Sequence, residues 1–218
     1  MNITEQENKL FDELRAKDPS IIDDGIVCEE EYLHAKYRIM YVLKEVNGGE
    51  SWSLKEFLRN GGRPQTWDNI ARWTEAILDL DTEKSWDYWE KDKEERRKKF
   101  LKKICAINVK KTSGGYTANN KEIKSAAIDN SAMLQKQLSI YTPDIVICCG
   151  TEIPFVKACY PNKTLNWKRT SRGIWYFVDN NRIVVSFKHP EARVMSCLLL
   201  YGLVDAVKEI LTTENLLK

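Results

Sequence analysis

Three polar segments of the chain stand at the ends of apolar runs, and their residue types could do chemistry together. The apolar runs cover residues 39–43, 104–109 and 183–187, and the segments are Lys44-Glu45-Val46-Asn47, Asn108 with Lys110-Lys111, and Lys188-His189-Pro190. These segments supply a carboxylate, two amides, an imidazole and several cations. Such a set can orient a water, read the edge of a base, stabilise an oxyanion and hold phosphates.

Other kinds of site find no support in the sequence. No serine or cysteine is placed with a histidine as a nucleophile pair requires, and neither G-x-x-x-x-G-K-[ST] nor G-x-G-x-x-G occurs. The six cysteines lie mostly inside apolar runs and show no C-x-x-C spacing, which favours buried reduced thiols over a metal or iron–sulfur site. We therefore expect no metal and no cofactor.

The elements that must position these segments alternate along the chain. The predicted strands cover 39–43, 104–109, 145–149, 174–178 and 183–187, and the predicted helices cover 3–17, 53–60, 66–80, 86–103, 119–140, 151–158 and 196 to the end. Strands that alternate with helices predict a three-layer α/β/α sandwich with a mainly parallel central sheet. The carboxyl ends of parallel strands share one edge, so we expect the polar segments to meet there.

Composition sets the remaining expectations. The 218 residues, 43% hydrophobic and 30% charged, predict a single domain over 1–218, with an N-terminal helix and an acidic loop in 1–37 packed on it. The net charge of +2 identifies no partner by itself. The N-terminus is polar and acidic, and no apolar run has the length of a membrane span. We expect a monomer with no membrane partner, in the cytoplasm of a bacterium or in a phage-related intracellular setting.

In their order along the chain, the motifs resemble those of the uracil-DNA glycosylase superfamily. Members have a first strand that ends in a water-orienting residue, a second that ends in an Asn reading the flipped base, and a late strand that ends in His-Pro-Ser. The counterparts here are L-K-E-V-N (43–47), C-A-I-N-V-K-K-T (105–112) and S-F-K-H-P-E-A-R (186–193). The stretch P-D-I-V-I-C-C-G-T-E (143–152) is similar to a strand-to-helix segment of many members. The resemblance covers about residues 38–200 and implies the fold of that family.

The resemblance also implies roles for the site residues. Glu45 stands where the family has its water-positioning Asp or Asn, and Asn47 could share that task. Both would align the attacking water and stabilise the positive charge that grows on the deoxyribose. Asn108 would bind the Watson–Crick edge of the flipped base, and His189 would donate to the base oxygen that gains charge as the base leaves.

A DNA partner follows from the same resemblance. Arg193 or Val194 would fill the hole that the flipped base leaves in the duplex. The family's stacking aromatic follows G-R-P, where this chain has Gln65, so Trp67 is a displaced candidate for stacking on the base. The expected phosphate contacts are basic residues near the strand ends and in the 161–173 segment, namely Lys110, Lys111, Lys168, Arg169, Lys188 and Arg193.

The residues after the first motif bear on the substrate. Uracil enzymes of the family often place a bulky Tyr there, which blocks a substituent on C5 of the pyrimidine. This chain has Asn47 followed by Gly48 and Gly49, which leaves room. We therefore expect a monofunctional DNA glycosylase that excises a C5-substituted pyrimidine, such as the glucosylated hydroxymethylcytosine of phage DNA, in antiviral defence. Lys44 and Lys188 keep a lyase activity open.

Three other functions remain open. The first is a uracil-DNA glycosylase in base-excision repair. The second is a nucleic-acid-binding module without chemistry, because Glu45 replaces the family's Asp or Asn and Glu191 replaces its Ser. The third is a small-molecule hydrolase on the same scaffold, since fold does not fix function. Structural roles are also open, with Glu45 pairing Lys44 at the surface, Asn108 satisfying a turn and His189 preceding a proline turn.

Overall fold

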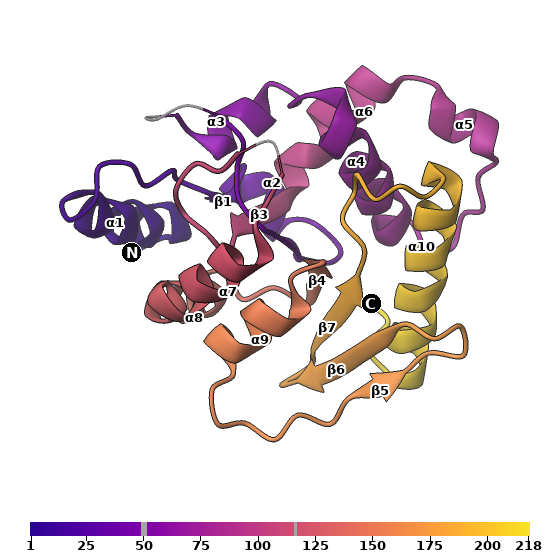
Figure 1. The fold of residues 1–218 in the computed structure, drawn as a ribbon. Coiled ribbons are helices and arrows are strands. Elements are labelled where there is room, and N and C mark those ends of the chain that lie inside the picture. The colour runs from indigo at the N-terminus through magenta and orange to yellow at the C-terminus, as the bar shows by residue number, and fades with distance from the viewer. Residues whose placement is uncertain (49–51, 116) are drawn as a thin grey trace.

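The computed structural model describes residues 1–48, 52–115 and 117–218 (Figure 1). The strands are β1 (Gly25–Ile26), β2 (Ile39–Leu43), β3 (Ile104–Asn108), β4 (Ile145–Cys149), β5 (Lys168–Arg169), β6 (Trp175–Asp179) and β7 (Arg182–Phe187). The α-helices are α1 (Ile3–Arg15), α2 (Glu29–Leu33), α3 (Leu54–Arg59), α4 (Pro64–Leu78), α5 (Trp86–Glu90), α6 (Lys93–Phe100), α7 (Asn120–Asp129), α8 (Ser131–Tyr141), α9 (Glu152–Cys159) and α10 (Ser196–Thr213). A short 3-10 helix, η1 (Leu101–Lys103), leads into β3.

The seven strands of the described residues form one sheet in the order β1-β3-β2-β4-β7-β6-β5. The central strands β3, β2, β4 and β7 are parallel to one another. The outer strands are antiparallel, with β1 against β3, β6 against β7 and β5 against β6. The α/β class is confirmed. The sheet is mixed, so the expectation of a mainly parallel sheet is not confirmed: parallel pairing is confined to the four central strands.

Helices cover both faces of this sheet, and the central strands therefore contribute side chains to two hydrophobic cores. In β2, Tyr41 lies in one core together with Trp73 of α4 and Leu203 of α10. Its neighbour Met40 lies in the other core, with Leu134 of α8. Successive side chains of a strand point to opposite faces, so a strand between two helical layers must be apolar at every position. That requirement explains the unbroken apolar runs that predict β2, β3 and β4.

Two of the predicted helices are each divided into shorter helices. The helix expected over 86–103 breaks at Asp92, whose φ of 48° is left-handed and ends the helical path. The helix expected over 119–140 breaks at Asn130, whose side-chain amide donates to the carbonyl of Val109 at 3.0 Å. In both places a residue that favours local hydrogen bonding over the helix interior interrupts an otherwise helical pattern.

The N-terminal region joins the sheet more closely than its sequence indicates. Residues 1–37, expected to form a helix and an acidic loop, contain β1 and α2 in addition to α1. The buried carboxylate of Glu7 in α1 accepts from the backbone N–H of Ile26 at 3.2 Å and from the Tyr141 hydroxyl at 2.6 Å. These bonds attach α1 to the sheet and to α8. In the described ranges, no helix has the length and apolar character to cross a membrane.

Candidate active site at the carboxyl edge of the sheet

The chain leaves β2 and β4 in opposite directions along the sheet. From β2 it passes through α3 to α6 and returns to β3, and from β4 it passes through α9 and reaches β7 on the other side. In open α/β sheets, ligands bind outside the carboxyl ends at such a switch point. Lys44 follows β2 there, and Gly150 follows β4 with a left-handed φ of 69° that favours glycine. A Cβ on Gly150 would lie 3.9 Å from Cε of Lys44, so the two segments are in contact.

Glu45 is covered by the loop that follows β3. Its side chain is 6% exposed, and its Oε2 accepts from Nζ of Lys110 at 2.9 Å. The backbone of Gly114 closes over the carboxylate, since a Cβ there would fall 2.0 Å from Cδ of Glu45. The N–H of Gly114 donates to the carbonyl of Val46 at 2.8 Å, which holds the loop in place. No described residue hydrogen-bonds Oε1 of Glu45, so one carboxylate oxygen remains available to a water.

Asn108 ends β3 beside Leu43 of β2 and is 2% exposed. Its backbone N–H donates to Oδ2 of Asp24 at 2.6 Å, which fixes the end of the strand. Its side-chain Oδ1 is buried and has no hydrogen-bond partner among the described residues. Buried acceptors are rarely left unpaired, because losing water without a new bond costs free energy. Asn108 therefore combines a fixed backbone with a free amide oxygen.

His189 presents a defined tautomer just after β7. Its Nδ1 accepts from the backbone N–H of Glu191 at 3.1 Å, so the proton of the neutral ring is on Nε2. Burial lowers the pKa of the imidazole below its ordinary value; the charge of Lys44 lowers it further and that of Glu191 opposes the change. His189 is thus a neutral donor near neutral pH, and the effect of the Lys44 charge on its pKa indicates that the ends of β2 and β7 lie near each other.

The first turn of α4 holds the segment that carries His189. The side chain of Asn69 donates to the carbonyl of Pro190 at 2.8 Å, and the hydroxyl of Thr66 donates to the carboxylate of Glu191. Arg63, just before α4, lies 3.8 Å from the same carboxylate. These contacts position the loop without using the imidazole itself.

Two predicted phosphate contacts are available on either side of His189. Lys188 and Arg193 are exposed, and no ion pair joins either of them to another described residue. Val194 is exposed too, although apolar. Lys110 differs, because its charge is already paired with Glu45 and, at 3.5 Å, with Glu122.

The prediction that Lys111 contacts DNA is wrong. Its side chain is 1% exposed, and its Nζ donates to both carboxylate oxygens of Asp24, at 2.8 and 2.9 Å. The same Nζ donates to the side-chain oxygen Oε1 of Gln137 at 2.7 Å. Gln137 also donates to Asp24 at 2.8 Å. We call Asp24, Lys111 and Gln137 the Asp24 cluster. Its lysine is used in the interior and cannot reach a phosphate.

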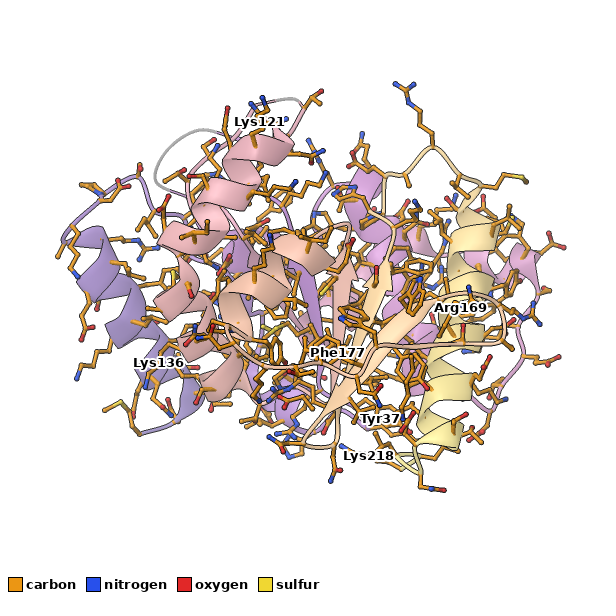
Figure 2. The ribbon with its side chains drawn as sticks, turned by 60° about the horizontal axis from the view of Figure 1, so that its bottom comes forward. Tyr37, Lys121, Lys136, Arg169, Phe177 and Lys218 are labelled. Atoms are coloured by element: carbon orange, nitrogen blue, oxygen red, sulfur yellow. The ribbon has the colours of Figure 1, made fainter. Side chains whose placement is uncertain are left out.

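The other two predicted phosphate contacts lie on the outermost strand of the sheet. Lys168 forms an ion pair with Glu214, just after α10, at 2.8 Å, so its charge is satisfied within the protein. Arg169 is exposed and places its guanidinium 5.5 Å from the centroid of the Trp175 ring. Figure 2 shows Arg169 at the β5 side of the sheet. Because β6 separates β5 from β7, these two residues lie beside the candidate site and not over it.

In addition to Asn108, Trp67 and Gly48 were expected to lie against the base, and both have close neighbours inside the protein. Trp67 is buried in the core and packs against Gly62, where a Cβ would fall 2.8 Å from the indole. The indole of Trp52 packs on Gly48, where a Cβ would lie 3.1 Å from its Nε1. The Cβ side of Gly48 is therefore occupied, which corrects the expectation of open space there. Gly49, the other glycine of this expectation, lies outside the described residues.

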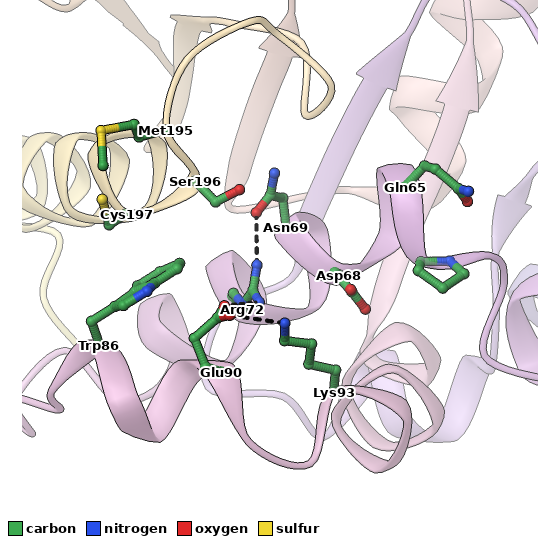
Figure 3. A pocket seen from close by; sticks show the side chains of 11 residues that line it. Gln65, Asp68, Asn69, Arg72, Trp86, Glu90, Lys93, Met195, Ser196 and Cys197 are labelled. Atoms are coloured by element: carbon green, nitrogen blue, oxygen red, sulfur yellow. Dashed lines mark hydrogen bonds and ion pairs between the residues drawn. The ribbon is translucent and has the colours of Figure 1, made fainter.

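A pocket of about 520 Å³ lies between α4, α5 and the start of α10 (Figure 3). It is lined by Asn69 and Arg72 of α4, by Trp86 and by the first residues of α10. Arg72 stacks on Trp86 at 5.1 Å and donates to Asn69 at 3.1 Å. Asn69 connects this pocket to the candidate site, because the same side chain holds the carbonyl of Pro190. Within the described ranges, no three His, Cys, Asp or Glu side chains gather as metal ligands would.

Near the site, one residue and one contact of a predicted residue were not predicted from the sequence. Asp24 supports Asn108 from 84 positions earlier in the chain, and nothing near it in sequence indicates this contact. Lys44 approaches Gly150, where a Cβ would lie 3.9 Å from its Cε, and donates to Asn120 at 3.0 Å. The sequence places Lys44 at a strand end. Its contact with Gly150, just after β4, follows only from the order of strands in the sheet.

Comparison with known proteins adds no assignment. No protein-family model matches the chain, and no curated protein sequence matches it either. The function is therefore inferred from the residues at the sheet edge.

Proposed function

We propose that this protein is a monofunctional DNA glycosylase that flips a modified pyrimidine out of DNA and hydrolyses its N-glycosidic bond. The observation that carries the proposal is the buried Oδ1 of Asn108, which lacks a partner among the described residues on the edge that also holds Glu45 and His189. An unpaired buried acceptor favours a ligand that brings an N–H group. The Watson–Crick edge of a flipped pyrimidine offers such donors.

In the proposed reaction, water attacks C1′ while the bond between C1′ and N1 of the base breaks. The electron pair of that bond leaves with the base, the oxygen bound to C1′ gives up one proton of the water, and the departing base takes up a proton. The sugar becomes an abasic site. Glu45 would align the water through Oε1 and stabilise the positive charge on the sugar, with Asn47 assisting. His189 would donate from Nε2 to the O2 atom of the pyrimidine, which gains negative charge. The neutral ring with its proton on Nε2 supports that role.

The proposed partner is DNA, bound by the protein as a monomer in the cytoplasm. The exposed cations Lys188 and Arg193 on either side of His189 support phosphate contacts there. The exposed side chain of Val194 supports the idea that this loop fills the space of the flipped base.

The proposed substrate is a C5-substituted cytosine, such as glucosylated hydroxymethylcytosine, which would fit a role in antiviral defence. Asn47 supports this proposal, because its side chain is exposed and is smaller than the tyrosine that uracil enzymes of the family often have at this place. Because Trp52 occupies the Cβ side of Gly48, room for the substituent depends on Asn47. Uracil is the alternative base.

A nucleic-acid-binding module without chemistry is the second candidate, and one observation favours it. Glu45 is 6% exposed, paired with Lys110 and covered by Gly114, so its carboxylate has a structural role regardless of catalysis. Such a protein would bind DNA and leave every base in place.

The test is alkali-revealed strand cleavage of DNA that contains uracil, hydroxymethylcytosine or glucosylated hydroxymethylcytosine at one position. We expect cleavage with one of these bases, and a rate lowered about 10²- to 10³-fold in His189→Ala, by analogy with the loss of one oxyanion donor. Glu45→Gln should lose activity comparably. The matched control is His34→Ala, which removes the only other histidine, on the exposed C-terminal end of α2.

Equal activity in His34→Ala and His189→Ala would contradict the proposed mechanism. No cleavage of any base, together with salt-dependent DNA binding, would favour the binding module. Absence of both activities would favour the small-molecule hydrolase.

A further inference from the structure

The face of the sheet beyond α9 carries a tryptophan that the helices do not cover. Trp175 of β6 pairs with Arg169 of β5, and its neighbour Tyr176 pairs with Val185, so Trp175 stands beside Ser186 of β7. Phe177, on the same face of β6, is buried, but Trp175 is 49% exposed. The three residues Ser186, Trp175 and Arg169 thus form a row across three strands, with the exposed indole in the middle.

The row is held in a fixed geometry. The guanidinium of Arg169 lies 5.5 Å from the centroid of the Trp175 ring, which is within the range of a cation–π contact. The hairpin that joins their strands closes tightly, with Gly173 at a φ of 89° and its N–H donating to the carbonyl of Thr170 at 2.9 Å. In the part of the chain that the structure describes, Arg169 has no carboxylate within ion-pair distance. An ordered ring and an uncompensated positive charge therefore face outward together.

The row lies close to His189 along the sheet. Ser186 precedes His189 by three residues, and Trp175 is on the next strand. With about 3.3 Å per residue along a strand and about 4.8 Å between strands, the backbones of Trp175 and His189 are about 11 Å apart. Lys188, an exposed cation, directly precedes His189 in the chain.

We propose that Trp175 and Arg169 form a stacking platform for an unpaired nucleotide in the strand that carries the excised base. Every base has a π-face that can stack on an indole, and a guanidinium can stack on a base or meet a phosphate. A base paired within a duplex cannot offer its face in this way. The position of this nucleotide beside the flipped one rests on the proposed function, whereas binding of single strands by the platform does not.

The experiment measures fluorescence anisotropy of a labelled 12-nucleotide oligothymidine and of a blunt duplex of the same length, with the full-length protein. Loss of one stacked base predicts a single-strand affinity roughly 5- to 150-fold lower in Trp175→Ala. Trp175→Phe should retain most of the affinity, Arg169→Ala should lose part of it, and the duplex affinity should change less than twofold. Tyr201→Ala, which removes an exposed aromatic of α10, is the control.

Thermal melting of each variant shows whether it folds, and Trp175→Phe keeps the test decisive if the alanine variant does not. Single-strand affinity that is unchanged in Trp175→Ala, or lost equally for both DNA forms, would overturn the platform. So would a Trp175-dependent dimer in sedimentation, because a second copy would then cover the ring. Excision assays separate the two proposals: binding that depends on Trp175 without excision of any base rejects only the glycosylase, and excision without that dependence rejects only the platform.

Discussion

Two charged regions meet at the end of β3, and they differ in how completely their groups are paired. Lys110 and Lys111 are adjacent residues just after β3, yet their side chains have different surroundings. Lys111 enters the interior, where Asp24 and Gln137 bind it. Lys110 stays at the sheet edge, where Glu45 binds it at 2.9 Å. One region belongs to the core and the other to the candidate site.

Asn108 belongs to both regions, through its backbone to one and through its side chain to the other. Asp24 of the buried region accepts the backbone N–H of Asn108, while the side-chain oxygen of Asn108 is left without a partner among the described residues. The buried region thus fixes the position of a residue whose functional atom stays free. Burial lowers the pKa of Lys111, and the charge of Asp24 opposes this effect. The stability of the Asp24 cluster therefore depends on its ion pair more than the stability of the candidate site depends on the pair of Lys110 and Glu45.

The largest expected effect is on stability, from breaking the buried pair. Lys111→Met leaves Asp24 buried without its cation, which should lower the free energy of unfolding by about 3–5 kcal/mol. Lys110→Met breaks a part-buried pair whose lysine is 19% exposed, so the loss of stability should be smaller than that in Lys111→Met. Urea denaturation followed by tryptophan fluorescence measures both. Similar losses in the two variants would remove the distinction between the regions, and Lys111→Met combined with Asp24→Asn should recover part of the loss.

A smaller effect is expected at the loop that covers Glu45. In Gly114→Ala the new methyl group would fall 2.0 Å from Cδ of Glu45, so the loop or the carboxylate must move. Overpacking of this kind costs about 1–3 kcal/mol of stability, and displacement of Glu45 should slow excision. Gly115→Ala is the matched control, since nothing described lies within 4 Å of a Cβ there. Urea denaturation and single-turnover excision of both variants test this, and equal behaviour would show that Glu45 is not confined by the loop.

The sequence predicts the apolar central strands well, because burial on both faces demands an unbroken apolar run. It does not predict β1, since two residues, Gly25 and Ile26, carry no periodicity. The burial of Lys111 was also missed, because Asp24 is 87 positions away and a basic pair after a strand resembles a phosphate-binding loop. Local pattern thus identifies the elements and the edge, whereas the pairing that separates a structural lysine from a surface one depends on tertiary contacts.

The smallest expected effect is a shift in the titration of His189, and it shows whether the edge acts as one electrostatic unit. Burial and the charge of Lys44 lower the pKa of His189 below the value of about 6.5 of an unfolded chain. The unfolded state then binds more protons between the two pKa values. Stability should therefore fall as the pH decreases from about 6.5 to the folded pKa, and this group should cause no further change below it.

NMR measures this pKa directly, because His34 and His189 are the only histidines. In Lys44→Met, the loss of the neighbouring positive charge should raise the pKa of His189 toward its ordinary value, and the acid limb of excision should move to higher pH with it. Lys188→Met is the control, because Lys188 does not contribute to the shift of His189. Equal titration in both variants would mean that the ends of β2 and β7 are not coupled. A neutral donor at the edge would then depend on burial alone.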